Sequence, residues 1–332
     1  MPRDCPPLRV LTWQVHGNYM FYLSQVPCEW WLVTRDGHPP GYAGRTPGFP
    51  WGANVREIPE SQVPEAQVDC VLYQSRRHWE TDRHTLLAPA QRELPSVYLE
   101  HDPPQAHPSC TRHWAEGVSL LVHVTPFNAL MWDSGEIPAR VVEHAAIVPA
   151  DIRCSARRSE GIAVINHLQR RGRRLGADVY CELQRQAPLR LIGMDSESMP
   201  GGLGEIAHAE LPAFIAEYRY LLNPIRWTSL GLSVVEAMLL GMPVLGLATT
   251  ELVSVIENGR NGWLATDPQQ LAEVMRQLSA DRALALRWGA QARATAQARF
   301  GIERFVRDWC EVLAAVTTSG ALPSGVRASS LA

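Results

Sequence analysis

The chain has 332 residues and no lysine, so all 31 of its basic residues are arginine. Without a lysine amine, Schiff-base chemistry with pyridoxal phosphate or a carbonyl substrate is excluded, and so is a phosphate loop that depends on lysine. Any group that holds a phosphate here must be an arginine, a backbone amide or a neutral donor. These exclusions hold even though genomic base composition is a sufficient reason for the missing lysine.

Paired cysteines and long apolar runs are missing as well. The seven cysteines show no C-x-x-C spacing, which is typical of reduced thiols rather than of a disulfide framework or a zinc site. No apolar run approaches the roughly 20 residues that span a bilayer, and the N-terminus has no signal-peptide pattern. The formal net charge of −3 does not favour nucleic acid. We therefore expect a cytoplasmic protein without a transmembrane segment, while peripheral contact with the inner membrane face stays open.

The length predicts two domains, because domains usually hold about 100–200 residues. We place the boundary in the polar, arginine-containing stretch 149–159, which gives a first domain of residues 1–150 and a second of residues 151–316. Residues 317–332 are mostly small and polar, and we expect them to be disordered.

The stretch from Tyr220 to Gly262 organises the second domain. Its apolar runs and breakers predict a strand, a loop, a helix over 232–240 that Gly241 ends, a second strand, and a helix capped by Thr250. Alternating strands and helices predict a parallel sheet, in which ligands lie beyond the carboxyl ends of the strands. The backbone amides that open the helix over 232–240 are placed to receive an anion.

Four arginines follow the first predicted strand of the second domain, at Arg170, Arg171, Arg173 and Arg174. A run of like charges is usually a solvated face. This run lies in the predicted loop between a first strand and a first helix, which is where phosphates are held in nucleotide-binding domains. We favour a phosphate contact over a solvated face.

In the first domain, the strongest site signal is His101-Asp102, at the carboxyl end of a predicted strand. The alternative is that Asp102 caps a turn and His101 is merely exposed. A glycine loop with Gly17 and Asn18 follows the first predicted strand, which alone is weak, and residues 36–64 are predicted as a long loop and 78–94 as a helix. The histidines match no metal-binding spacing, so we expect no metal.

These patterns together resemble GT-B retaining glycosyltransferases of the family-4 type, also called glycosyl transferases group 1. That family carries E-G-F-G-L-x-x-x-E-A-M-A-x-G-x-P-V after a strand, and residues 228–244 are TSLGLSVVEAMLLGMPV. The similarity extends through ENGRNGWL and covers most of residues 160–312. It implies an α/β GT-B fold, with two Rossmann-like doubly wound domains facing across a cleft. In that fold the last helix, about 300–316 here, packs back on the first domain.

The resemblance also implies roles for individual residues. The second glutamate of the family pattern, on the nucleotide ribose, is matched by Glu236, whereas the first, near the sugar, is replaced by Thr228. His101 and Asp102 match the T-x-H-D near the reacting sugar and are the expected catalytic residues. The expected donor-binding residues are Gly17, Asn18, Arg173, Arg174, Thr228, Ser229, Leu230, Gly231, Leu232 and Glu236.

The expected activity is transfer of a sugar from a nucleotide diphosphate sugar to an acceptor hydroxyl, with retention and without a cofactor or metal. Its partners would be the nucleotide-sugar donor and a carbohydrate or lipid-linked acceptor, in cell-surface polysaccharide or glycolipid assembly. Two alternatives stay open. A hydrolase or epimerase of the same fold would act on the same donors. A non-catalytic sugar-nucleotide-binding protein would account for Thr228, because the sugar then lacks a charged acceptor.

Overall fold

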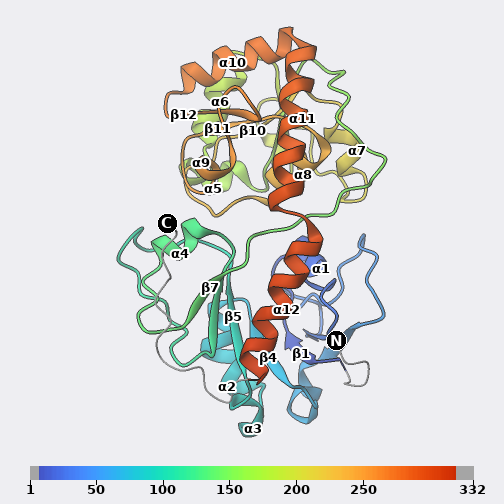
Figure 1. The fold of residues 1–332 in the computed structure, drawn as a ribbon, viewed down its shortest axis with the longest axis vertical. Helices are drawn as coiled ribbons and strands as arrows, with labels where there is room; N and C mark the ends of the chain where they lie inside the picture. The colour runs from blue at the N-terminus through green and yellow to red at the C-terminus, as the bar shows by residue number, and fades with distance from the viewer. Residues whose placement is uncertain (1–6, 319–332) are drawn as a thin grey trace.

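The computed structural model describes residues 7–318 as two lobes, each a parallel β-sheet covered by helices (Figure 1). The first sheet has seven strands in the order β3-β2-β1-β4-β5-β6-β7, and the second has five in the order β12-β11-β10-β8-β9. Every pair of neighbouring strands is parallel. Both are doubly wound arrangements, so the predicted α/β class is confirmed.

The first domain alternates short buried strands with short helices. Its strands are β1 Arg9–Thr12, β2 Glu29–Thr34, β3 Val55–Pro59, β4 Cys70–Tyr73, β5 Ser96–Glu100, β6 Leu120–His123 and β7 Ala139–Val141. Its α-helices are α1 Gly17–Leu23, α2 Arg83–Thr85, α3 Pro89–Arg92 and α4 Pro126–Met131, with a 3-10 helix over Glu60–Glu65 and a π-helix over His78–Asp82. Thr125 caps α4 as its sequence predicts, because its hydroxyl accepts from the backbone N–H of Asn128.

The second domain has longer helices around a smaller sheet. Its strands are β8 Gly161–Val164, β9 Leu189–Ile192, β10 Tyr220–Asn223, β11 Val244–Leu247 and β12 Gly262–Ala265. Its helices are α5 Leu168–Leu175, α6 Ala177–Gln184, α7 Leu211–Ile215, α8 Leu232–Leu240, α9 Leu252–Val255, α10 Pro268–Ala280 and α11 Arg282–Arg299, with a 3-10 helix over Ser196–Ser198. The last helix, α12 Ile302–Thr318, follows α11.

The order of the strands in each sheet predicts where ligands bind. In a doubly wound sheet, ligands lie beyond the carboxyl ends of the two strands between which the winding reverses. These strands are β1 and β4 in the first sheet and β8 and β10 in the second. The segments that follow them are therefore the expected site segments: residues 13–18 and 74–76 in the first domain, and 165–174 and 224–231 in the second.

Three local predictions are wrong. The predicted loop 36–64 contains β3, which was missed because only Val55 and Ile58 of this edge strand are buried. The helix predicted over 78–94 is broken before Pro89, since Ala88 is held in an extended conformation. Thr250 does not cap α9: it has a positive φ of 54°, and the residue before the helix is Glu251.

Helices α8 and α11 cross closely because two glycines meet. A Cβ on Gly289 would lie 1.9 Å from the carbonyl oxygen of Gly241, so the crossing requires glycine there. Gly241 also ends α8 as predicted, with a positive φ of 88°. This crossing fixes α8, whose first turn belongs to the candidate site.

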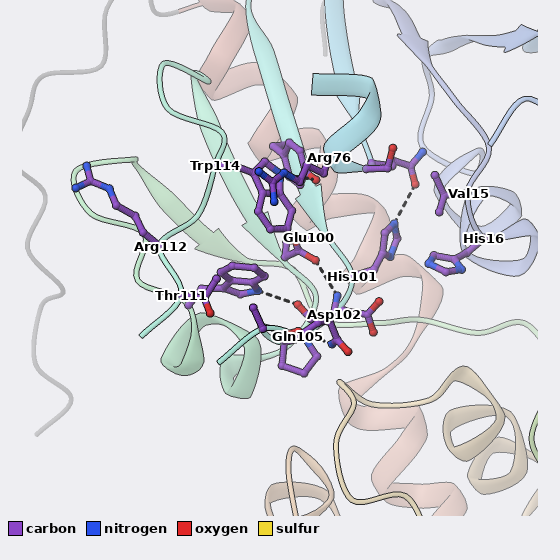
Figure 2. A pocket seen from close by; sticks show the side chains of 16 residues that line it. Val15, His16, Arg76, Glu100, His101, Asp102, Gln105, Thr111, Arg112 and Trp114 are labelled. Atoms are coloured by element: carbon purple, nitrogen blue, oxygen red, sulfur yellow. Dashed lines mark hydrogen bonds between the residues drawn. The ribbon is translucent and has the colours of Figure 1, made fainter. Parts of the chain in front are cut away.

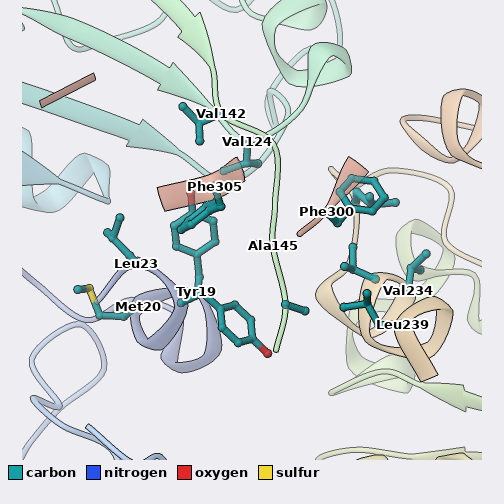
Figure 3. Packing of buried hydrophobic residues seen from close by; sticks show 14 of the residues in the cluster. Tyr19, Met20, Leu23, Val124, Val142, Ala145, Val234, Leu239, Phe300 and Phe305 are labelled. Carbon is teal, nitrogen blue, oxygen red and sulfur yellow. The ribbon is translucent and has the colours of Figure 1, made fainter. Parts of the chain in front are cut away.

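Helix α12 leaves the second domain and runs along the first, next to α1 (Figure 1). Phe305 packs edge-on against Tyr19 of α1, with ring centroids 5.7 Å apart. Figure 3 shows how one apolar cluster continues from Leu23 and Phe305 to Phe300 and to Val234 of α8 in the second domain. The helix extends through Thr318 and so includes the first two residues of the predicted tail, and the rest of that tail lies outside the described residues.

Hydrogen bonds also join the two domains. The indole N–H of Trp227 donates to the backbone carbonyl of Pro104 at 2.9 Å, and the backbone N–H of Phe127 donates to the Glu251 carboxylate at 2.9 Å. Within residues 7–318, no helix is both long enough and apolar enough to cross a membrane.

Candidate donor and acceptor site between the domains

The loop after β10 ends at an open helix terminus. Gly231 is the N-cap of α8 and provides no side-chain hydrogen bond to the first turn, so amides of this turn remain available to a ligand. Thr228, Gly231 and Leu232 are partly exposed. Ser229 and Leu230 are buried, at 8% and 2% exposure, so they contribute backbone and packing more than free side chains.

Glu236, one turn inside α8, points toward the first domain. Its Oε1 accepts a hydrogen bond from the Tyr22 hydroxyl at 2.9 Å and from Asn18 Nδ2 at 3.3 Å, and both donors belong to α1. Burial raises the pKa of Glu236 to about 7, although both hydrogen bonds oppose the shift. The buried carboxylate of Glu236 is thus held between the domains by hydrogen bonds from Tyr22 and Asn18.

Gly17 and Asn18 lie where the sequence places them, at the start of α1 after β1. A Cβ on Gly17 would lie 3.2 Å from both Gln14 and Thr46, so the turn is tightly packed. The structure therefore brings together Asn18 and Glu236, two predicted donor-binding residues that lie 218 positions apart.

The arginines lie on α5 and not in a loop, which corrects the sequence interpretation. Gly172, with a φ of 56°, interrupts this helix. Arg173 pairs with Asp178 at 2.6 Å, within its own domain. Arg174 donates to the side-chain oxygen of Gln105 in the first domain, and so remains at the interdomain face.

Arg171, which was not chosen from the sequence, faces the first domain. Burial lowers its pKa, and the negative charge of Asp102 opposes that shift. Arg171 also lowers the pKa of His16 through charge repulsion, after the larger effect of desolvation. The charge of Arg171 therefore acts on two first-domain residues, one that follows β1 and one that follows β5.

His101 and Asp102 follow β5, as predicted. The Nε2 of His101 lies 3.0 Å from Gln74 Oε1, and its ring packs edge-on against His16 at 4.6 Å between centroids. Burial, followed by the charges of His16 and His144, holds the pKa of His101 well below its ordinary value. His101 is therefore a neutral imidazole at pH 7.

A pocket of about 530 Å³ opens beside His101 and Asp102, within the first domain (Figure 2). Two tryptophans form part of its wall. The indole N–H of Trp114 donates to the Tyr98 hydroxyl, and that of Trp132 donates to the Asp102 carbonyl. The Trp114 ring stacks on His113 and packs edge-on against Trp132, so the two tryptophans form a fixed aromatic wall. The pocket size and aromatic lining fit a small organic molecule.

Glu100 lies at the inner side of this pocket (Figure 2). Its Oε1 accepts from the backbone N–H of Asp102 at 3.0 Å, and its Oε2 accepts from His113 Nε2 at 3.2 Å. Burial raises the pKa of Glu100 to about 8. Both oxygens are thus engaged within the first domain, which makes Glu100 a structural carboxyl of the pocket.

His16, Tyr22 and Trp114 were missed from the sequence, and Arg171 was named in its group of four arginines but not selected. Nothing local distinguishes these residues from other polar or aromatic residues. The usable signal was the strand order, because His16 follows β1 and Arg171 follows β8, both at a winding reversal. Among the described residues, no group of three or more His, Cys, Asp or Glu side chains could hold a metal ion.

Comparison with known proteins agrees with this geometry. Residues 184–281 match the family model described as glycosyl transferases group 1. The match covers α8 and its preceding loop, including every donor-binding residue predicted between Thr228 and Glu236.

Solved structures with the same fold confirm GT-B for the whole described chain. The sucrose-phosphate synthase of Thermosynechococcus elongatus covers 95% of this chain and all of its own, with a TM-score of 0.67 at 15% identity. HepE of Anabaena, in complex with UDP, covers 93% of this chain and all of its own, with a TM-score of 0.66 at 15% identity. At these identities the similarity establishes the fold.

A curated relative is an uncharacterized 41.2 kDa protein in the cps region of Klebsiella pneumoniae, 40% identical over 74 residues. The match includes 22% of this chain and spans about a fifth of that relative, 21% of its length.

Proposed function

We propose that this protein transfers a sugar from a nucleotide diphosphate sugar to an acceptor hydroxyl. The observation that carries the proposal is the 3.3 Å contact between Asn18 and Glu236, beside the uncapped first turn of α8. It combines a carboxylate for the ribose with a helix terminus for the diphosphate. The solved structure of HepE with UDP supports a nucleotide diphosphate as ligand of this fold.

In this proposal the donor binds along the second domain. The diphosphate is stabilised by Arg171 and Arg174 together with the amides at the start of α8, because its charge increases as the sugar leaves. The ribose hydroxyls donate to Glu236. Thr228 lies near the sugar, where it offers a hydroxyl instead of a carboxylate.

The acceptor binds in the first-domain pocket. Its hydroxyl oxygen forms a bond to the anomeric carbon while the bond from that carbon to the diphosphate oxygen breaks. The nucleotide diphosphate leaves with the bonding electron pair, and the proton of the acceptor hydroxyl passes to the departing phosphate oxygen. Holding the two substrates together removes much of the entropic cost of reaction. His101 and Asp102 lie at the end of β5, beside the acceptor pocket, and are the proposed catalytic residues.

The resemblance favours retention of anomeric configuration, which we keep as part of the proposal. We also propose that the acceptor is a carbohydrate or lipid-linked intermediate of cell-surface polysaccharide or glycolipid assembly. The similarity to a protein of the Klebsiella pneumoniae cps region favours this setting.

A second candidate is a non-catalytic sugar-nucleotide-binding protein, and Thr228 is the observation that favours it. Mixing the protein with a panel of UDP-, GDP- and ADP-sugars, with and without saccharide acceptors, separates the candidates. Release of nucleotide diphosphate only when an acceptor is present supports the transferase, and the anomeric coupling constant of the product reports retention. Release without an acceptor indicates a hydrolase, and binding without release indicates the binding protein.

A further inference from the structure

Tyr22 belongs to the first domain, but its hydroxyl bonds a donor-side residue of the second. The hydroxyl donates to Glu236 Oε1 at 2.9 Å, and Tyr22 itself is 1% exposed. A buried tyrosine hydroxyl ordinarily finds a partner within its own core. This hydroxyl instead lies across the domain boundary, on a residue 214 positions away.

The two hydrogen bonds to Glu236 both end on the same oxygen. Tyr22 and Asn18 donate to Oε1, and no described residue donates to Oε2. Glu236 as a whole is 6% exposed, so the side chain is not completely enclosed by protein. The first domain thus holds one oxygen of the carboxylate and leaves the other for a ligand.

Tyr22 is the better-placed of the two donors. Its bond is shorter, at 2.9 Å against 3.3 Å, and Asn18 Nδ2 is shared with His208 Nδ1, which lies 3.3 Å away. The tyrosine ring has few rotameric choices and is packed in the main apolar cluster with α1 and α12 residues. A rigid, buried donor fixes the orientation of the carboxylate more firmly than a shared amide.

We propose that Tyr22 is a positioning residue for the donor ribose: it holds Glu236 so that Oε2 accepts the ribose hydroxyls. This inference rests on the proposed function, because it requires a nucleotide at Glu236. It adds that ribose recognition in the second domain depends on a side chain of the first. Nucleotide binding and interdomain contact are consequently coupled through one carboxylate.

The test compares ribose discrimination in Tyr22→Phe with that in the parent. Calorimetry measures the dissociation constants of UDP, GDP and ADP and of their 2′,3′-dideoxy forms. For whichever of the three nucleotides the parent protein binds, the 2′,3′-dideoxy form should bind more weakly than the ribose form. Loss of one hydrogen bond that orients the carboxylate should reduce this discrimination by about two- to tenfold.

Tyr218→Phe is the matched control. Tyr218 is fully buried, and its hydroxyl has no hydrogen-bond partner in the structure. This substitution should leave discrimination unchanged. Glu236→Gln, measured alongside, shows how much discrimination the carboxylate supplies, and thermal unfolding shows whether each variant is folded.

The outcomes separate the two levels of the proposal. If no nucleoside diphosphate binds the parent, the proposed function is wrong and this inference with it. If the parent discriminates, Glu236→Gln does not, and Tyr22→Phe discriminates as well as the parent, only the role of Tyr22 is wrong. Weaker binding of both ribose and dideoxy forms by the same factor also contradicts it, because that pattern indicates a structural role.

Discussion

Glu100 in the first domain and Glu236 in the second are both buried carboxyls, and they are satisfied differently. Glu100 in the first domain has both oxygens bonded within that domain, by the backbone of Asp102 and by His113. Glu236 in the second domain is bonded on one oxygen only, and both donors come from the other domain. Burial raises both pKa values, to about 8 for Glu100 and about 7 for Glu236.

The difference separates a carboxyl that supports a pocket from one that is available to a ligand. A buried polar group needs partners, and a group whose partners are complete has nothing left to offer a substrate. Glu100 therefore maintains the shape of the first-domain pocket. Within residues 7–318 nothing donates to the second oxygen of Glu236, which makes Glu236 the candidate for ribose recognition.

The largest expected effect is on Glu236 itself. Glu236→Gln should weaken nucleotide diphosphate binding by about ten- to a hundredfold, because a hydrogen bond to a charged group contributes about 1.5–3 kcal/mol. Glu100→Gln should bind the nucleotide as well as the parent does. Calorimetry on both variants makes the comparison, and equal losses would mean that the two carboxyls do not differ as described.

The pH dependence should follow the same carboxyl. Glu236 has its pKa raised to about 7, so it is ionised above pH 7 and becomes protonated as the pH falls below it. The groups that face it are Tyr22 and, through Asn18, His208. Because the ribose hydroxyls donate to the ionised form, binding at pH 6 should be about tenfold weaker than at pH 8.

The nucleotide's own phosphates also titrate in this range, so Glu236→Gln is the reference for the pH experiment. The ratio of parent to variant affinity should rise with pH through 7. A constant ratio would show that Glu236 does not change its protonation state on the way to binding.

The arginines of α5 should differ in their effect on nucleotide binding, according to the residues that they contact. Arg171→Gln should weaken binding of the nucleotide diphosphate by about tenfold, with little effect on the nucleoside, since a phosphate contact is charge-assisted. Arg173→Gln is the control, because Arg173 pairs with Asp178 within its own domain. Fluorescence titration with UDP and uridine distinguishes these cases. A larger loss of nucleotide diphosphate affinity in Arg173→Gln than in Arg171→Gln would favour Arg173 as the phosphate-binding residue, as expected from the sequence.

The first-domain pocket should affect the acceptor alone. Trp114→Ala removes an aromatic wall, and aromatic contacts of this kind contribute about 0.5–1.5 kcal/mol. We expect the KM for the acceptor to rise about two- to tenfold, while the KM for the donor stays unchanged. Steady-state kinetics with each substrate varied in turn tests this, and a change in donor KM would show that the two sites are not separate.

The smallest change in nucleotide binding is expected for Thr228→Glu. The longer, charged side chain should crowd the sugar and lower turnover, while the free nucleotide diphosphate binds within about twofold of the parent, since we propose that Thr228 lies near the sugar and not the ribose. Initial rates and calorimetry on the same preparation measure both. A gain in sugar transfer would favour a protein that has lost catalysis over a working enzyme.

The second domain was largely predictable because its site is local in sequence. Thr228 to Glu236 lie within one loop and one helix, which the sequence pattern predicts, and their expected roles come from the resemblance to the family pattern. The first-domain pocket is assembled from segments after β1, β4 and β5 and from the loop that carries Trp114, and no periodic pattern links these segments. His101-Asp102 was identified because it follows a clear strand.

Contacts across the domain boundary could not be predicted from the sequence, because they depend on how the two domains pack together. Tyr22 has the pattern of an ordinary core residue of α1, and only the folded arrangement shows that its hydroxyl lies on Glu236. The arginines of 170–174 were recognised as a group, but choosing among them required the break at Gly172 and the position of Asp178.

The most direct test of the donor site is a crystal structure with the nucleoside diphosphate that stabilises the protein most in a thermal-shift screen. A ligand at 100 times its dissociation constant should add about 2.7 kcal/mol of stability, which makes the screen sensitive. The account predicts ribose oxygens within hydrogen-bond distance of Glu236 Oε2, and the diphosphate between the first turn of α8 and Arg171. A nucleotide bound with its ribose away from Glu236, or with its diphosphate on Arg173, would contradict it.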